Sequence, residues 1–270
     1  TNWGFKSTFL KSQAKRIVNC HGFDIYKYPF KSKINFDIMK RTFEINDKII
    51  IRTNEGKSFL MENFNLPSSK IIVFDGGINL DKLSLDSLGK SNTTHILDKY
   101  SIDESDTVIF INRGLRKVFW PVINFFKIFN KLAFKHPNLK IILLKGSDDE
   151  LYSHIEPFLL KNNLSERVIY IDHFVKYEEM KYLYSQSDIV LSLPSRDNLS
   201  YAIAESMWFG CLTLISDLAQ YREILEDGKH VFFLNHNDSE KILFRMEEII
   251  DNLDKYKEKM IPASRKLVID

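Results

Sequence analysis

Cysteine is scarce in this chain. Only Cys20 and Cys211 occur among 270 residues, and neither belongs to a CxxC pair or to a Cys/His spacing typical of zinc ligands. This scarcity excludes a disulfide framework and a zinc centre built from cysteines. Each cysteine lies beside an apolar, strand-like segment, so we expect both thiols to be reduced and buried. The cytoplasm is therefore the expected compartment.

The sequence also lacks a long apolar run and an excess of one charge. No run approaches the roughly 20 residues that a helix needs to cross a bilayer. The 38 basic and 36 acidic residues give a formal net charge of +2, which is too balanced for a protein that mainly neutralises a nucleic-acid backbone. We expect a soluble protein that binds no nucleic acid.

One basic cluster leaves a membrane role open. Lys31, Lys33, Lys40 and Arg41 lie close to apolar side chains between residues 30 and 36. Basic residues beside apolar ones suit a lipid surface, so peripheral association with the inner membrane surface is one interpretation. An ordinary solvated face is the other.

Length and composition predict two modest domains. A chain of 270 residues with 44% hydrophobic residues can bury two cores of ordinary size. No solenoid repeat or low-complexity tract is visible. The first residues, Thr-Asn-Trp-Gly, show neither an initiator Met nor a signal-peptide pattern, so we expect the chain to be truncated at its N-terminus.

Short apolar runs alternate with segments of helical period, which predicts an α/β fold with parallel sheets. In the second part, the expected strands are residues 107–111, 139–144, 168–171, 189–193, 212–215 and 231–234. A helix begun near residue 220 is expected to end at Asp227-Gly228. In the first part, we expect strands at 16–20, 48–53 and 70–74, with helices at 36–45 and 55–63. The polar stretch before residue 106 reads as a connection. The predicted ranges are therefore 1–85 for a partial first domain, 86–105 for a linker and 106–270 for a Rossmann-like second domain.

A polar loop at residues 195–205 enters a helix directly after the apolar strand 189–193. Free N–H groups and the positive end of the helix dipole attract an anion there, and Glu205 can accept hydrogen bonds from sugar hydroxyls. Open parallel sheets place ligands at the carboxyl ends of their strands. The loop therefore predicts a site for a phosphorylated sugar ligand. The alternative makes Asp197 a solvated turn residue and Glu205 an exposed helix charge.

The segment from Asp197 to Glu205, followed by Ser-Met-Trp-Phe-Gly and a strand, resembles the donor-site signature of GT-B glycosyltransferases of family four. That signature has Glu, seven residues, Glu-Ala-Met-Ala, then Gly and a strand, and Asp197 stands at the position of the first Glu. The resemblance implies that Glu205 binds the ribose hydroxyls of the donor nucleotide. It also implies that the backbone of Asp197, Asn198, Leu199 and Ser200 approaches the diphosphate and the transferred sugar. A GT-B enzyme has two facing α/β domains, of which this chain would hold the final half of the first and nearly all of the second.

The first domain contributes one further match to this family. His21-Gly22-Phe23-Asp24 is similar to its His-Gly-Ser-Asp segment, with Phe23 in place of Ser. The resemblance implies that His21 faces the donor sugar across the cleft and acts in catalysis. A histidine that ends a strand and bonds backbone is the alternative.

Cations follow the strand at 107–111. Arg113 aligns with an arginine of the family, and the resemblance implies that it and a nearby lysine neutralise the donor diphosphate as it leaves. The second cation is Arg116, Lys117 or the strand-end Lys145, and Lys117 is our catalytic candidate beside Arg113. A solvated loop explains Arg116 and Lys117 equally well.

Three weaker motifs complete the set. Phe174 follows the strand at 168–171, where the resemblance implies a contact between the loop and the nucleotide base, although simple packing is as good an explanation. Asp148 and Glu150 resemble a metal-binding Asp-x-Asp, but Ser147 and three carboxylates also suit a helix start. We expect no metal and no cofactor. Arg222-Glu223 also has a family counterpart, but a cap or salt bridge is the expected role.

Together these features predict a glycosyltransferase that moves a sugar from a nucleoside-diphosphate-sugar donor to a glycan or lipid-linked acceptor, in polysaccharide or glycoconjugate biosynthesis. Retention of anomeric configuration is implied by the family resemblance alone. Two alternatives stay open: a non-catalytic, glycosyltransferase-like subunit that binds a nucleotide or a partner, and a nucleotide-sugar epimerase of similar fold.

Overall fold

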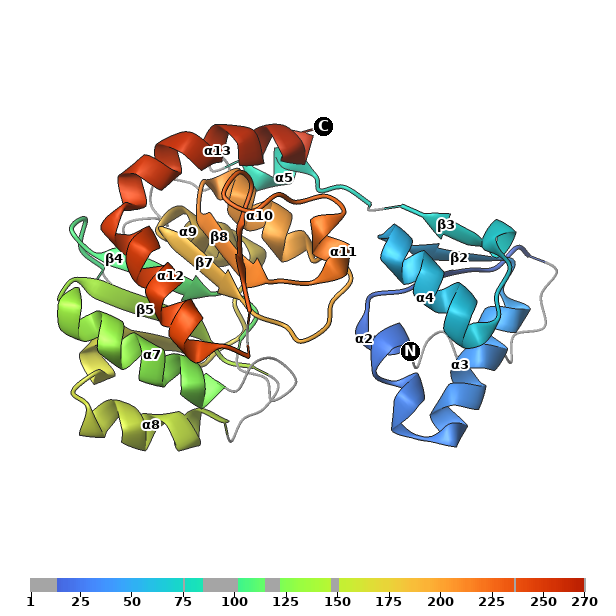
Figure 1. Cartoon of the computed structure of the whole chain (residues 1–270), viewed down its shortest axis with the longest axis horizontal. Helices are drawn as coiled ribbons and strands as arrows, with labels where there is room; N and C mark the ends of the chain where they lie inside the picture. The colour runs from blue at the N-terminus through green and yellow to red at the C-terminus, as the bar shows by residue number, and fades with distance from the viewer. Residues whose placement is uncertain are drawn as a thin grey trace. The chain divides into compact units, whose positions relative to one another are not determined.

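The computed structural model describes residues 14–74, 76–84, 102–114, 122–146, 151–235 and 237–269. The chain divides into two compact units (Figure 1). Unit 1 consists of Thr1–Gly77, Arg196–Ser200 and Leu218–Ile224, and unit 2 consists of Ile78–Ser195, Tyr201–Asp217 and Leu225–Asp270. The predicted domain limits at residues 85 and 106 stay predictions, because most of the predicted linker lies outside the described residues.

Unit 1 is built on a three-stranded parallel sheet in the order β1-β2-β3. Its strands are β1 (Ile17–Asn19), β2 (Lys48–Ile51) and β3 (Ile71–Val73). Its helical segments are α2 (Phe23–Tyr26), η1 (Pro29–Lys31), α3 (Lys33–Ile45), α4 (Asn54–Phe64) and η2 (Ser68–Lys70), with α11 (Ala219–Arg222) from its third segment. The predicted strands and helices form, so the α/β prediction for this part is confirmed.

The predicted strand 48–53 is two residues too long, for a local reason. The Thr53 hydroxyl accepts a hydrogen bond from the Gly56 N–H at 3.1 Å, so Thr53 is the N-cap of α4. N-cap threonines satisfy N–H groups that the first helical turn leaves open. The chain therefore leaves the sheet at Ile51 and begins the helix three residues later.

Aromatic side chains of α3 and α4 pack over the sheet of unit 1. The rings of Phe36 and Phe64 stack with centroids 5.0 Å apart, and Phe43 meets Phe64 edge-on at 4.9 Å. Phe30 touches this group but keeps 51% of its surface exposed, and Ile34 keeps 71%. Phe30 and Ile34 are apolar side chains that lie beside the basic cluster in the sequence. The association of this cluster with a membrane surface stays a prediction. Within the described residues, no helix combines the length and apolar composition needed to span a bilayer.

Unit 2 is built on a six-stranded parallel sheet in the order β6-β5-β4-β7-β8-β9. The strands are β4 (Thr107–Ile111), β5 (Leu139–Leu144), β6 (Val168–Ile171), β7 (Ile189–Ser192), β8 (Leu212–Ser216) and β9 (Phe232–Leu234). The helical segments are α5 (Leu80–Leu83), α7 (Val122–Lys135), α8 (Leu151–Lys161), η4 (Ser165–Arg167), α9 (Tyr177–Ser185), α10 (Tyr201–Phe209), α12 (Ser239–Asp251) and α13 (Leu253–Ile269). Every strand predicted for this part forms, with ends that differ by at most one residue.

Successive residues of β4 bury their side chains on opposite faces of this sheet. Ile109 packs with the α7 phenylalanines Phe125, Phe126 and Phe129 in one core cluster. Phe110 belongs to a second cluster that contains side chains of α9. This period of two residues in a strand buried on both faces explains its continuous apolar sequence.

One predicted helix end is wrong. The Asp227-Gly228 pair does not end a helix begun near residue 220, because α11 ends at Arg222. Gly228 has φ of +67° and its N–H donates to the Val231 carbonyl at 2.8 Å. The pair therefore forms a tight turn that leads into β9, and glycine supplies the positive φ that this turn needs.

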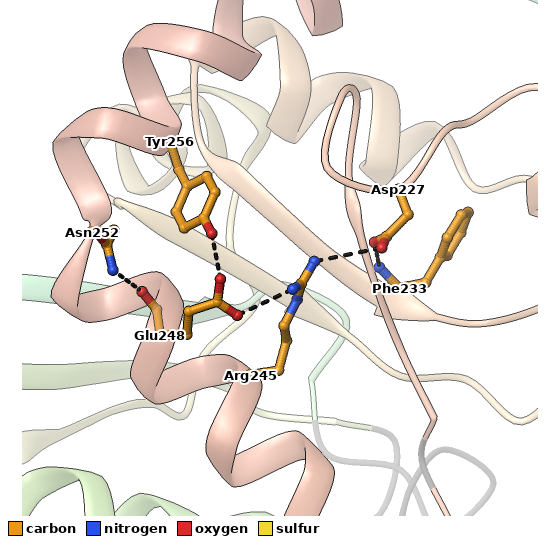
Figure 2. Close-up of polar contacts among 6 residues, drawn as sticks. All are labelled: Asp227, Phe233, Arg245, Glu248, Asn252 and Tyr256. Carbon is orange, nitrogen blue, oxygen red and sulfur yellow. Dashed lines mark hydrogen bonds and ion pairs between the residues drawn. The ribbon is translucent and has the colours of Figure 1, made fainter.

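A polar network connects α12, α13 and the chain around β9 (Figure 2). The Arg245 guanidinium lies 3.5 Å from the Asp227 carboxylate and donates to the Glu248 carboxylate at 3.1 Å. The Tyr256 hydroxyl donates to the other Glu248 oxygen at 2.5 Å, and the Phe233 N–H donates to Asp227 at 2.9 Å. Every charge in this network has a partner of opposite charge, so we assign it a structural role.

Candidate functional site

The carboxyl edge of the unit 2 sheet contains a topological switch point between β4 and β7. The chain proceeds from β4 to β5 and β6 on one side and then returns to β7 on the other side of β4. Open α/β sheets bind ligands outside the carboxyl ends of the strands at such a point. Arg113, Lys145 and Phe174, all predicted from sequence, follow the adjacent strands β4, β5 and β6 at this edge.

The loops after β4 and β5 are packed against each other. Gly114 has φ of +67°, and a Cβ atom at this position would lie 2.9 Å from the Lys145 carbonyl oxygen. Any side chain larger than hydrogen would therefore push the two loops apart. Gly114, the residue after the half-buried Arg113, therefore lies against the backbone of Lys145, whose side chain is exposed. Arg116 and Lys117 lie outside the described residues.

The aromatic candidate Phe174 lies in solvent after β6. Its side chain is 89% exposed, so the packing explanation for this residue is wrong. The neighbouring His173 ring nitrogen Nε2 lies 3.1 Å from a Glu179 carboxylate oxygen at the start of α9. An exposed ring at the carboxyl end of a strand is available to stack on a planar ligand.

Glu205 lies in α10 and is half-buried. The Tyr184 hydroxyl donates to Glu205 Oε2 at 3.3 Å, and among the described residues no lysine or arginine pairs with this carboxylate. Burial raises the pKa of Glu205, while the hydrogen bond from Tyr184 acts to lower it. A charge that is partly removed from water without a cation is costly, so the exposed-charge alternative does not describe this site.

Two residues that sequence reasoning missed hold Glu205 in place. Tyr184 is 1% exposed, and its hydroxyl accepts a hydrogen bond from the Asn112 side-chain amide at 3.0 Å. Asn112 is 6% exposed, and its side-chain oxygen has no hydrogen-bond partner in the part of the chain that the structure describes. In the sequence, Tyr184 fits the apolar stripe of its helix, and Asn112 is an isolated amide between a strand and Arg113. An asparagine directly after a buried strand was the only available signal.

In unit 1, the carboxylate of Asp197 is engaged by the protein itself. Asp197 is 6% exposed and accepts a hydrogen bond from the Tyr221 hydroxyl at 2.7 Å. The Gln220 side chain donates to the Asp197 carbonyl at 2.5 Å. The description of Asp197 as a solvated turn residue is therefore wrong, and its side chain fixes the conformation of the 196–200 segment.

The next residues of that segment contact the loop after β1 within unit 1. The Asn198 side-chain amide donates to the Cys20 carbonyl at 3.0 Å, and a Cβ atom on Gly22 would lie 3.2 Å from the Asn198 nitrogen. Gly22 has φ of +108°, so glycine satisfies both the backbone and the space. Within unit 1, the exposed His21 thus lies between two residues that contact Asn198 of the predicted donor loop. The backbone N–H of His21 donates to the Asp24 carboxylate at 3.0 Å.

Two backbone features of the predicted loop follow from its neighbours. Leu199 has φ of +38°, which is uncommon for a residue with a side chain, and its carbonyl accepts a hydrogen bond from Arg52 at 2.5 Å. Arg52 is 6% exposed. Ser200, the last residue of the segment, is half-buried. The buried guanidinium compensates part of the strain at Leu199.

The carboxylate of Glu223 has the predicted capping role. It accepts hydrogen bonds from the backbone N–H groups of Asn54 at 2.8 Å and Glu55 at 2.5 Å, at the N-terminus of α4. An acidic side chain at this position complements the helix dipole.

Metal binding has no support among the described residues. Within the ranges that the structure describes, no three or more His, Cys, Asp or Glu side chains are grouped to hold a metal ion. Ser147, Asp148 and Glu150 lie outside those ranges, so their two interpretations stay open.

A family comparison covers most of unit 2. The profile described as "Glycosyl transferases group 1" matches residues 93–267. An uncharacterized glycosyltransferase of Methanocaldococcus jannaschii is 28% identical over 146 residues, which are 53% of this chain and 34% of that protein. The match therefore spans about a third of that relative.

Solved structures share the fold over nearly the whole chain. HepE of Anabaena, in complex with UDP-glucose, superposes with a TM-score of 0.77 at 12% identity, over 98% of this chain and 70% of that one. A glycosyltransferase from Rickettsia africae superposes with a TM-score of 0.75 at 19% identity, over 96% of this chain and 66% of that one. The predicted GT-B fold is confirmed. The profile match adds the family: this chain belongs to the glycosyl transferases group 1 family.

Proposed function

We propose that this protein is a glycosyltransferase that moves a sugar from a nucleoside-diphosphate-sugar donor to a glycan or lipid-linked acceptor in the cytoplasm, in polysaccharide or glycoconjugate biosynthesis. The observation that carries the proposal is Glu205, a half-buried carboxylate that lies in the same unit as the cation Arg113 and whose partner among the described residues is Tyr184. A ligand with hydroxyl donors and an anionic diphosphate matches both groups. The UDP-glucose complex of HepE supports a UDP-sugar as the first donor to test.

Each group has a defined role in this proposal. Glu205 accepts hydrogen bonds from the ribose hydroxyls and so orients the nucleotide. Arg113 and Lys145 stabilise the negative charge that grows on the diphosphate as the bond to the sugar breaks. Phe174 offers its exposed ring to the base. The roles predicted for His21 and for Asp197, Asn198, Leu199 and Ser200 stay predictions.

The proposed chemistry is a displacement at the anomeric carbon. A bond forms between the acceptor oxygen and this carbon, the bond to the diphosphate oxygen breaks, and the acceptor proton passes to the leaving phosphate. This front-face course retains the anomeric configuration and needs no protein nucleophile. The fixed cations, rather than a metal ion, neutralise the leaving group in this proposal.

The direct test is calorimetric titration with UDP. Glu205→Gln should bind UDP about 10- to 100-fold more weakly than wild type, the range for losing a hydrogen bond to a charged group. Glu248→Gln is the matched control, because Glu248 also accepts from a tyrosine but lies in the structural network. Equal affinities for wild type and a folded Glu205→Gln protein would remove Glu205 from the donor site.

Turnover assays separate the proposed activity from its alternatives. Incubation with UDP-sugars and a mixture of glycan and lipid-linked acceptors should release UDP and label an acceptor. UDP binding without turnover on any acceptor would indicate the non-catalytic subunit. Release of a free, epimerised sugar would indicate the epimerase.

A further inference from the structure

Three side chains from three elements form a hydrogen-bonded chain beside the switch point of unit 2. Asn112 follows β4, Tyr184 lies near the end of α9, and Glu205 lies in α10. The Asn112 amide donates to the Tyr184 hydroxyl at 3.0 Å, and this hydroxyl donates to Glu205 Oε2 at 3.3 Å. The first two residues are almost completely buried, while Glu205 is half-buried. The chain therefore runs from the interior towards the surface and ends at the carboxylate.

The direction of this chain follows from a count of protons. An amide nitrogen can only donate, a phenol has a single proton, and an ionised carboxylate can only accept. Because Asn112 donates to the Tyr184 oxygen, the Tyr184 proton is directed to Glu205. With the reverse orientation of its amide, the Asn112 oxygen would accept the Tyr184 proton. The Tyr184 and Glu205 oxygens would then face each other without a proton between them. The arrangement thus favours the ionised form of Glu205.

Packing fixes the phenol at one position. The Tyr184 ring stacks on Phe209 with centroids 5.6 Å apart and an interplanar angle of 6°, and it meets Phe110 edge-on at 5.4 Å. A ring enclosed on two sides keeps its hydroxyl in place without a loss of side-chain entropy when a ligand binds. Tyr184 contacts Oε2, and no donor among the described residues contacts the other carboxylate oxygen, Oε1, which a ligand can therefore reach.

We propose that Tyr184, oriented by Asn112, is a positioning residue for the donor ribose: it fixes the Glu205 carboxylate so that its second oxygen meets the ribose hydroxyls. This inference rests on the proposed function, because it needs Glu205 to bind the nucleotide. Asn112 is also the residue before Arg113, so the hydrogen-bonded chain joins the ribose carboxylate to the strand end that carries the proposed diphosphate cation. Tyr184 acts through Glu205 and does not touch the ligand.

The role has a pH signature. Within the described residues, the titratable groups that interact with Glu205 are Tyr184 and Tyr177, both in α9, and Cys211 is a further neighbour of Tyr184. Burial raises the pKa of Glu205, and the Tyr184 hydrogen bond opposes this rise. Removal of the hydroxyl should raise the pKa of Glu205 further. The ionised form that binds ribose is then lost at a higher pH.

The experiment is UDP titration of Tyr184→Phe from pH 5 to 8, compared with wild type at each pH so that titration of UDP itself cancels. UDP affinity at pH 7 should fall about 3- to 10-fold, the effect of one hydrogen bond. The pH at which affinity declines should rise by about half a unit to one unit. Tyr182→Phe is the matched control, because Tyr182 is 3% exposed on the same helix, and its titration should follow wild type.

Further variants keep the outcome decisive. Asn112→Ala should weaken UDP binding in the same direction, and it replaces Tyr184→Phe if that protein does not fold. In a Glu205→Gln background, Tyr184→Phe should change neither affinity nor pH profile. If Glu205→Gln weakens UDP binding while Tyr184→Phe and Asn112→Ala follow wild type, the positioning role is wrong and the proposed function stands. If Glu205→Gln itself follows wild type, the proposed function fails first.

Discussion

Glu205 and Glu248 each accept a hydrogen bond from a tyrosine hydroxyl, yet their surroundings shift the pKa of the carboxylate in opposite directions. Glu248 accepts from Tyr256 and from Arg245, and the Tyr256 hydrogen bond and the Arg245 charge lower its pKa (Figure 2). Among the described residues Glu205 accepts a hydrogen bond from Tyr184 only, and burial raises its pKa. Arg245 neutralises the Glu248 carboxylate, whereas no lysine or arginine of the described part of the chain pairs with Glu205.

The difference identifies where a ligand is expected. A partly buried charge without a cation lowers stability, so its presence requires another explanation. Groups with pKa values raised by burial are concentrated at functional sites, where a ligand supplies the missing partner. Satisfied charges, as in the network of Figure 2, are explained by stability alone. Variants at equivalent positions in the two regions should therefore fail in different ways.

The largest difference is expected for two arginines. Arg113→Ala removes the proposed diphosphate cation and should weaken UDP binding about 10- to 100-fold. Arg245→Ala removes the cation between Asp227 and Glu248, and should lower the free energy of unfolding by about 1 kcal/mol without changing UDP affinity. Calorimetric titration and thermal unfolding of both variants measure the contrast. Equal loss of UDP affinity in the two variants would contradict the assignment of Arg113 to the donor site and of Arg245 to a structural network.

A smaller effect is expected for the folding stability of the ligand-free protein when either glutamate is replaced. The raised pKa of Glu205 means that the folded protein holds its proton more tightly than the unfolded chain. Stability is therefore lost as pH rises from the ordinary glutamate value to the raised one. Glu205→Gln should raise the free energy of unfolding at neutral pH and should have little effect below the ordinary pKa of glutamate.

For Glu248, the contribution to stability should change with pH in the opposite direction. Its lowered pKa contributes stability that is present above the ordinary value and lost as pH falls through the lowered one. Glu248→Gln should therefore destabilise the protein at neutral pH and lose this effect in acid. Urea unfolding of both variants between pH 3 and 8 measures the two slopes. Slopes of the same sign would contradict the contrast between the two carboxylates.

The smallest expected effect concerns metal ions. In the proposal, protein cations rather than a metal neutralise the donor diphosphate. UDP affinity measured with EDTA should therefore lie within about twofold of the affinity measured with magnesium, a difference below about 0.5 kcal/mol. A loss of binding in EDTA that magnesium restores would require a metal site in the chain.

The sequence alone predicted the strands of the unit 2 sheet, with ends that lie within one residue of those observed. Apolar runs such as 139–144 have the same bounds in the structure because a strand buried on both faces needs a continuous apolar sequence. The prediction that Asp227-Gly228 ends a helix was wrong because Gly suits both a helix end and a turn. The hydrogen bond from Gly228 to Val231, which the sequence does not show, forms the turn.

The positions of Glu205 and Arg113 at the sheet edge were also accessible from the sequence, through their place after apolar strands and through the family resemblance. The roles of Tyr184 and Asn112 were not. These residues are 72 positions apart, and Tyr184 has the spacing of a core residue. Only the packing of α9 against β4 and α10 shows that its hydroxyl faces Glu205. Hydrogen bonds between distant residues leave no pattern in a single sequence.

The ribose contact itself can be measured by comparing UDP with 2′-deoxy-UDP, by calorimetry, in wild type and in Glu205→Gln. If Glu205 accepts from the ribose, wild type should prefer UDP by about 10-fold or more, and this preference should nearly disappear in the variant. The two ligands share their base and diphosphate, so other contacts cancel. A variant that keeps the full preference of wild type would contradict the assignment of Glu205 to the nucleotide ribose.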